Sequence, residues 1–215
     1  MNFDYGYDPS VVKASIVKVN ESFKMFTDAA CKSMQNDFVN QMGNCWAAPA
    51  AVEEFAKMKE ANDSLTSSAE RTFQSVVNVM NTGSRNWASQ TREGAVTVGF
   101  ESARTTIDVS CIKHDIGGKR GISSGSAQST ANVLTQIIAN VGTALDNAVS
   151  AVSSCGFISG SESGALQASL NQIKSSYTEA MTSNYNSMKK AIEQTIEEYR
   201  STSKTNTGNF TANSN

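Results

Sequence analysis

Apolar residues recur at every third or fourth position along two long stretches of this chain. In the first stretch they are Val12, Ile16, Val19, Phe23, Phe26, Ala30 and Met34. Steps of three and four place side chains on one face of an α-helix, whereas a half-buried strand alternates at every second position. The pattern therefore predicts long amphipathic helices.

The same pattern returns 115 residues further along the chain. The first set then corresponds to Ala127, Ala131, Leu134, Ile138, Val141, Leu145 and Val149. At the same offset, Phe55, Met58, Leu65, Phe73 and Val77 correspond to Leu170, Ile173, Ala180, Met188 and Ile192. A repeat of this length suggests one helical hairpin used twice. The alternative explanation is that the match is accidental, because an offset that aligns the apolar positions can be found for any two long amphipathic helices.

Start and stop signals divide the first half into two helices. Asp8 offers an N-cap carboxylate and Pro9 suits the first helical position, so a helix is predicted from there to about residue 41. Residues 42–49 hold Gly, Asn and a second Pro, which favour a helix end followed by a new beginning. The second helix is predicted to run antiparallel to the first, as far as about residue 80, with an extension around Trp87 left open.

The second half is predicted to repeat this hairpin. One helix, rich in alanine, covers about residues 126–154, and another covers about residues 161–203. Glycines punctuate the break between them, at residues 155–161. The last residues, 204–215, are mostly Thr, Asn, Gly and Ser, so we expect a disordered tail.

The segment between the two halves has a different composition. Residues 95–100 and 105–112 are rich in β-branched residues and partly alternate, with a short polar joint between them. A small β-hairpin is predicted here, and a helix over residues 95–113 stays open as an alternative. Residues 115–121 contain three glycines and read as a flexible connector.

Together these elements predict an all-α protein of two long antiparallel helical hairpins. They pack either as a four-helix bundle or as an elongated tandem. The expected division is a first hairpin at residues 1–92, an insert at 93–122, a second hairpin at 123–203 and a tail at 204–215.

Composition narrows the classes of function. The net charge of the 215 residues is −2, and basic and aromatic residues do not interleave, which argues against nucleic acid as a partner. No apolar run approaches the ~18 residues of a membrane-spanning helix, and the first residues lack a signal peptide. We therefore expect a protein that is secreted without a cleaved signal peptide, or is cytoplasmic before export.

Candidate chemistry is sparse, so neither an enzyme nor a metal or cofactor site is predicted. The four cysteines form no C-x-x-C pair, and His114 is the single histidine, three residues after Cys111. A surface histidine beside Asp115 is the expected arrangement, with a Cys–His dyad as the alternative. Cys45 and Cys155 occupy similar places in the two halves. Buried free thiols are expected for them, and a disulfide between them is the alternative.

The first break resembles the WXG family of proteins exported by type VII secretion systems. Trp46-Ala47-Ala48 stands at the turn, where the family has Trp-x-Gly, and the run 50–55, ending in Phe55, opens the second helix. The second break reads Ile158-Ser159-Gly160, which keeps the glycine and replaces the aromatic residue. The family's export signal, a Tyr followed four residues later by Asp, is matched only by Tyr199, because residue 203 is Ser.

The resemblance implies a non-enzymatic protein of a Gram-positive bacterium that acts through contacts between helix faces. In the family, a hairpin pairs with a second hairpin and the indole packs in the partner's groove. The implied turn and interaction residues are Trp46, Phe55, Ile158 and Gly160. The expected partners are proteins of the secretion system or a toxin, and a homodimer is a further arrangement. Two alternatives are an α-helical pore-forming toxin with a membrane tongue at residues 95–113, and a structural subunit of a phage or surface assembly.

Overall fold

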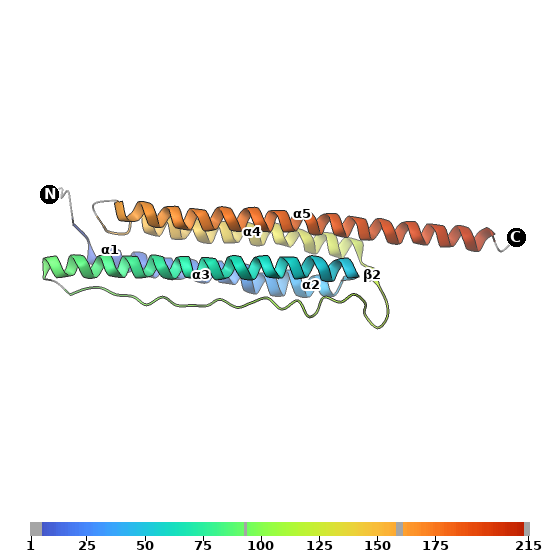
Figure 1. Cartoon of the computed structure of the whole chain (residues 1–215), viewed down its shortest axis with the longest axis horizontal. Coiled ribbons are helices and arrows are strands. Elements are labelled where there is room, and N and C mark those ends of the chain that lie inside the picture. The colour runs from blue at the N-terminus through green and yellow to red at the C-terminus, as the bar shows by residue number, and fades with distance from the viewer. Residues whose placement is uncertain (1–5, 93, 158–160, 213–215) are drawn as a thin grey trace.

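The computed structural model describes residues 6–92, 94–157 and 161–212, and over these residues the protein is an all-α bundle. Four long helical rods pack side by side, and a two-stranded antiparallel sheet lies at one end of them (Figure 1). The predicted fold class is confirmed, in its four-helix form.

The first rod is continuous from Pro9 to Gly43. It consists of α1 (Pro9–Thr27), a π-helical segment η1 (Asp28–Val39) and α2 (Asn40–Gly43). The predicted N-cap is present, because Asp8 Oδ1 accepts hydrogen bonds from the backbone N–H groups of Ser10, at 2.9 Å, and Val11, at 3.2 Å. The long π-helical stretch was not predicted, since side-chain spacing alone does not distinguish i→i+5 from i→i+4 hydrogen bonding.

The second rod is α3 (Pro49–Thr91), which is 11 residues longer than the sequence predicted. The Asn-Thr-Gly signal at residues 81–83 does not stop it. Ser84 and Ala88 beyond the signal are buried, and the ring of Phe157 packs directly on Gly83. Burial of this end favours continued helix over a local stop signal, and the helix ends where Arg92 adopts a left-handed conformation with φ of 59°.

The second hairpin consists of α4 (Ser124–Ser153) and α5 (Ser161–Ala212). The prediction of a disordered tail at residues 204–215 is wrong as far as Ala212, because α5 continues to that residue and projects beyond the other helices (Figure 1). Residues 200–207 are all exposed. A helix already nucleated in the bundle gains one internal hydrogen bond for each residue added, so this end needs no core of its own.

The two hairpins pack head to tail. α1 contacts α3 and α4, and α5 contacts α3 and α4. At one end of the bundle the Cys45 carbonyl accepts a hydrogen bond from Ser123 N at 2.7 Å, so the first turn lies beside the start of α4. At the other end Asp8 N donates to the Gly156 carbonyl at 2.9 Å, so the second turn lies beside the start of α1.

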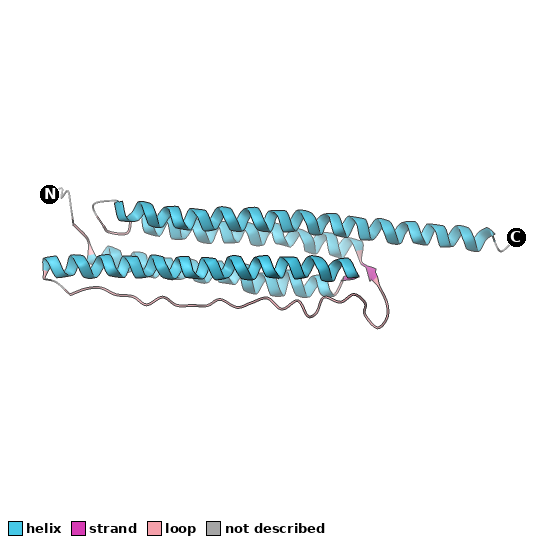
Figure 2. Ribbon diagram, in the orientation of Figure 1, coloured by secondary structure: helices cyan, strands magenta, loops and turns pink. Residues whose placement is uncertain are grey.

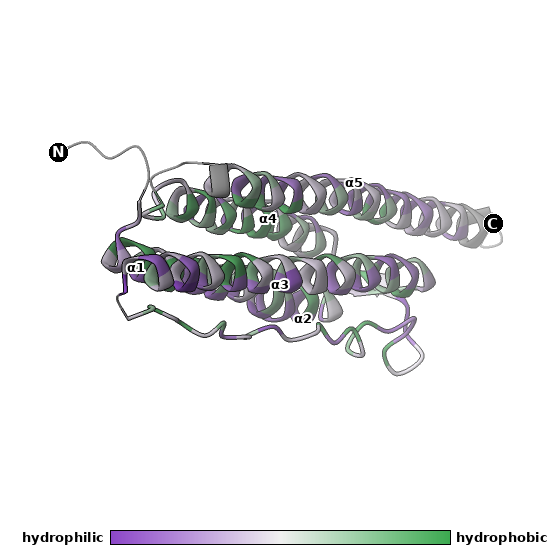
Figure 3. Ribbon diagram, turned by 60° about the vertical axis from the view of Figure 1, so that its left-hand side comes forward, coloured by the Kyte–Doolittle hydropathy of each residue, from purple (hydrophilic) through white to green (hydrophobic). Residues whose placement is uncertain are grey.

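The positions of the repeat form the core between the helices. All seven of the first set are buried, and of the seven matched positions in α4 five are buried, with Ile138 and Val149 partly exposed. Figure 3 shows α4 as largely hydrophobic, as expected for a helix that contacts α1, η1 and α5. The spacing of threes and fours thus corresponds to a real contact face in both halves.

A chain of polar groups crosses this apolar core. Asn62 on α3 is 0% exposed; its Nδ2 donates to the Ala30 carbonyl of η1, and its Oδ1 accepts from the Tyr177 hydroxyl of α5, each at 3.0 Å. Thr66 Oγ1 donates to the Asn62 carbonyl at 2.8 Å. The network joins three rods at one level, and a one-turn slip of any of them would leave buried polar groups without partners.

The insert forms neither the predicted β-hairpin nor a helix. Residues 94–113, which we call the strap, run along the bundle in one direction; they are extended as far as about residue 108 and make a turn at residues 109–112 (Figures 1 and 2). The reason is connectivity: α3 ends at one end of the bundle and α4 begins at the other. The 43 residues of α3 span about 64 Å, and 20 extended residues reach about 66 Å, whereas a 20-residue helix covers only about 30 Å and a hairpin returns to its start.

The two-stranded sheet lies at the end of this crossing. β1 (Trp46–Ala47) pairs with β2 (Gly121–Ile122), with Trp46 opposite Ile122 and Ala47 opposite Gly121. β2 thus lies in the predicted insert at 93–122, but its partner strand is the first turn and not a second strand of the insert. The sheet fastens the first turn to the residues that lead into α4.

We predict that Tyr177→Phe lowers the free energy of unfolding by about 1 to 3 kcal/mol, because it leaves the buried Oδ1 of Asn62 without its donor. The measurement is urea unfolding followed by circular dichroism. Tyr185→Phe on the same helix is the matched control, since its hydroxyl donates to Asn132 at an exposed site. Equal losses in the two variants would contradict a special role for the buried network.

Candidate interaction surfaces

Trp46, the residue that carries the resemblance at the first turn, is buried inside the chain. Its side chain is 1% exposed, and the small residues Ala47 and Ala48 that follow it are buried too. The indole Nε1 has no hydrogen-bond partner within the described part of the chain, so its packing is apolar. Since its backbone pairs with Ile122 just before α4, Trp46 lies where the two hairpins of this chain meet.

Phe55 is also a core residue. It is fully buried, and its ring stacks on that of Phe38 with centroids 5.4 Å apart and an interplanar angle of 22°. This contact joins α3 to η1. Ile158 and Gly160, the corresponding residues of the second break, lie outside the described residues. Of the two predicted positions that are described, Trp46 lies at the junction of the hairpins and Phe55 joins the helices of the first hairpin, and neither forms an exposed surface.

The cysteines and the histidine do not come together as a reactive group. Cys111 Sγ lies 3.7 Å from the Val39 carbonyl, and burial raises the pKa of its thiol. His114 is 67% exposed and pairs with Asp115 at 2.6 Å, as expected from their adjacency. Cys45 and Cys155 lie near opposite ends of the bundle and are not joined to each other, so the alternative of a disulfide between them is wrong.

The described residues also bear on metal binding and on membrane insertion. They hold no group of three or more His, Cys, Asp or Glu side chains that could bind a metal ion. Nor does any helix among them combine the length and the apolar character needed to cross a bilayer.

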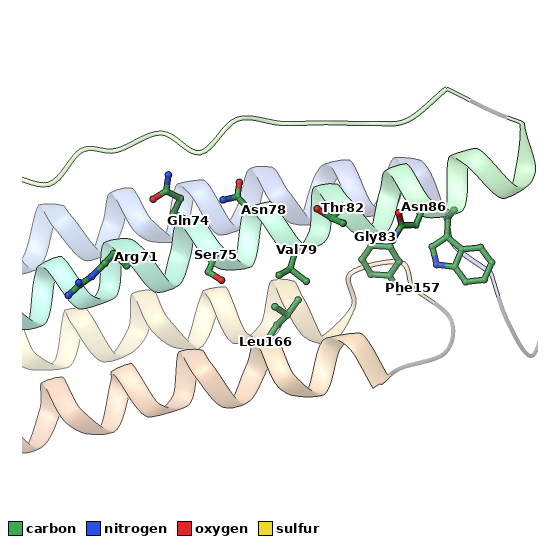
Figure 4. Close-up of a pocket in the computed structure, with 11 residues that line it drawn as sticks. Arg71, Gln74, Ser75, Asn78, Val79, Thr82, Gly83, Asn86, Phe157 and Leu166 are labelled. Carbon is green, nitrogen blue, oxygen red and sulfur yellow. The ribbon is translucent and has the colours of Figure 1, made fainter.

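A cleft of about 630 Å³ lies along the C-terminal half of α3 (Figure 4). Its wall is formed by α3 residues at helical spacing, by Phe157 of the second turn and by Leu166 of α5. The α3 residues are Arg71, Gln74, Ser75, Asn78, Val79, Thr82, Gly83, Asn86 and Trp87. Val79 is 46% exposed within it. Arg71 is the one charged side chain among these lining residues, and no ion pair involves it within the described part of the protein.

Sequence reasoning missed this cleft. Its face of α3 mixes one valine and one tryptophan with amides and hydroxyls, so it resembles an ordinary solvated helix face. The cleft exists because Phe157 and Leu166 approach α3 from distant parts of the chain, which periodicity does not reveal.

Comparisons of the chain with protein-family models, with curated proteins and with solved structures find no match. The resemblance to the WXG family therefore depends on the layout of helices and turns alone.

We predict that Trp46→Ala lowers the free energy of unfolding by about 3 to 5 kcal/mol, because it opens a cavity at the junction of the hairpins. Trp46→Phe should cost clearly less, since it keeps an aromatic ring and removes an N–H that has no partner. Thermal and urea unfolding check both values. Trp87→Ala provides the comparison with a partly exposed tryptophan, and a larger loss there than at Trp46 would contradict this assignment.

Proposed function

We propose that the protein is a WXG-like, non-enzymatic member of a type VII secretion pathway, an effector or carrier that acts through its helix faces. The observation that supports this most is the pairing of two hairpins, with Trp46 buried at the turn of the first. In the family, a hairpin is covered by a second one. Here the second hairpin belongs to the same chain and packs head to tail with the first.

The buried position of Trp46 changes what a partner can contact. Since the faces that would pair with a separate hairpin are already covered, a partner must use an outer surface. The cleft on α3 is the best candidate, because it offers Val79 and Trp87 as apolar contacts and Arg71 as a cation with no ion pair among the described residues. The matching partner is an amphipathic helix with an apolar stripe and a carboxylate placed toward Arg71.

The projecting end of α5 is a second feature in keeping with export. Tyr199 lies in the region where the family carries its export signal, and it is 37% exposed on a helix that continues past the bundle. The alternative of a membrane tongue receives no support from residues 95–113, because Ile107 and Ile112 within them are buried.

Export tests the proposal directly. Culture medium and cell fractions of the producing organism are compared with its type VII membrane ATPase intact and inactivated. We expect the protein in the medium only when the ATPase is active. Equal amounts in the medium in both strains, or none under any growth condition, would refute the assignment.

A second prediction addresses the cleft. Val79→Glu should reduce export at least ~10-fold while the urea unfolding curve shifts little, because the side chain is half exposed and its carboxylate would repel an acidic partner. Val52→Glu is the matched control, as Val52 is 39% exposed on the same helix and does not line the cleft. If the two variants are exported equally well, the cleft is not the docking surface.

A further inference from the structure

The strap lies in a groove formed by the first two rods. Asn20 Nδ2 of α1 donates to the Gly99 carbonyl at 2.8 Å, and Ser84 Oγ of α3 accepts from Val96 N at 3.2 Å. At the far end, Cys111 packs on Gly43, whose Cα lies close enough that an added Cβ would be 3.0 Å from the Cys111 carbonyl oxygen. The strap thus contacts nearly the whole length of the groove, in an extended conformation as far as about residue 108.

Two carboxamide side chains bind the main chain of the strap in the same way. Asn81 of α3 donates to the Val98 carbonyl at 2.8 Å and accepts from Val98 N at 3.0 Å. Gln35 of η1 donates to the Asp108 carbonyl at 2.9 Å and accepts from Asp108 N at 2.6 Å. Each amide supplies the paired hydrogen bonds that a neighbouring β-strand would supply. Because these bonds go to the backbone, they do not depend on the side chains at positions 98 and 108.

Selectivity comes from side chains between and beyond these two points. The ring of Phe100 packs on Phe23, with centroids 5.0 Å apart, and Ile107 and Ile112 are buried. An aromatic residue followed by branched aliphatic residues seven and twelve positions later therefore fits the groove. Proteins that bind extended peptides use the same two kinds of contact: hydrogen bonds to the backbone supply affinity, and side-chain pockets supply selectivity.

A charged clasp adds a further requirement. Arg104 Nε donates to Glu70 Oε2 at 2.9 Å, and the Ser102 hydroxyl hydrogen-bonds the other carboxylate oxygen of Glu70. These contacts lower the pKa of Glu70, the Ser102 hydrogen bond most of all. Glu70 thus selects a cation four residues after the aromatic residue.

We propose that the α1–α3 groove is a site for extended peptides, and that the strap is an occupant that a partner protein's segment of matching chemistry can replace. That segment carries an aromatic residue, then a basic residue at +4 and branched aliphatic residues at +7 and +12. Because the strap is part of the same chain, its effective concentration at the groove is high, and peptides of low affinity do not displace it. The site is separate from the cleft and does not depend on the export pathway.

The test uses the full chain and a fluorescent synthetic peptide of residues 94–113. Wild-type protein should bind it weakly, because the strap competes in cis. The double variant Phe100→Ala with Ile107→Ala weakens binding of the strap to the groove, and it should bind the peptide at least ~10-fold more tightly in an anisotropy titration.

Adding Asn81→Ala to this variant should weaken peptide binding again by about tenfold, because the two hydrogen bonds of Asn81 to the peptide backbone are lost. Glu101→Ala with Thr106→Ala, at two exposed strap positions, should leave binding as in wild type.

Arg104→Ala, which opens the clasp from the strap and leaves Glu70 in the groove for the peptide, provides a second strap-weakened variant should the first not fold. Amide exchange of wild-type protein gives an independent measurement: the N–H groups of Val98 and Asp108 should exchange faster than those of buried helix residues. Absence of peptide binding by a folded strap-weakened variant would overturn the proposal. So would binding that Asn81→Ala does not reduce, or exchange of the strap amides only on global unfolding. Dimers of the wild-type protein that form at high concentration in place of peptide binding would make a second copy the occupant and likewise overturn it.

Discussion

Every other feature of this structure depends on one constraint: each helical hairpin has an apolar face that it cannot bury alone. Two helices side by side leave one surface of their shared stripe open to water, and burying apolar area is the main favourable term in folding. The chain meets this constraint by containing the hairpin twice. Residues such as Phe23 and Phe73 of the first half then share one continuous core with Leu145 and Leu170 of the second.

The head-to-tail arrangement follows from this pairing and determines the connections. Each turn lies next to the start of the other hairpin, where backbone hydrogen bonds join Cys45 to Ser123 and Asp8 to Gly156. The polar chain through Asn62 then specifies the level at which the rods meet, because apolar contacts alone tolerate a slip of one turn more readily than a buried amide does. The connection from α3 to α4 must span the full length of the bundle, and the strap is extended because a helix of the same number of residues would be too short. Once extended, it presents its backbone to the side-chain amides of Asn81 and Gln35.

The helices could be predicted from the sequence, because their core positions repeat with helical spacing and their starts carry capping residues such as Asp8. The strap could not, since β-branched residues favour an extended backbone but do not reveal whether it folds back on itself. That outcome depends on the distance between helix ends, which is a property of the whole fold. Similarly, burial of Ser84 and Ala88 decides that α3 continues past its stop signal. Trp46 and Phe55 were predicted as turn and interaction residues, and the structure places both in the core, whereas the cleft beside Val79 depends on the distant Phe157.

The central claim is that one chain supplies two hairpins whose turns lie at opposite ends of a single bundle. It is tested most directly by the distance between spin labels at Asn44 and Ser153, two exposed positions at the first turn and at the end of α4, in a variant whose native cysteines are replaced. Because the first turn adjoins the start of the 30-residue α4, pulsed electron paramagnetic resonance should give a distance of about 45 Å. A single short distance below about 25 Å would place the two turns at the same end and contradict the account.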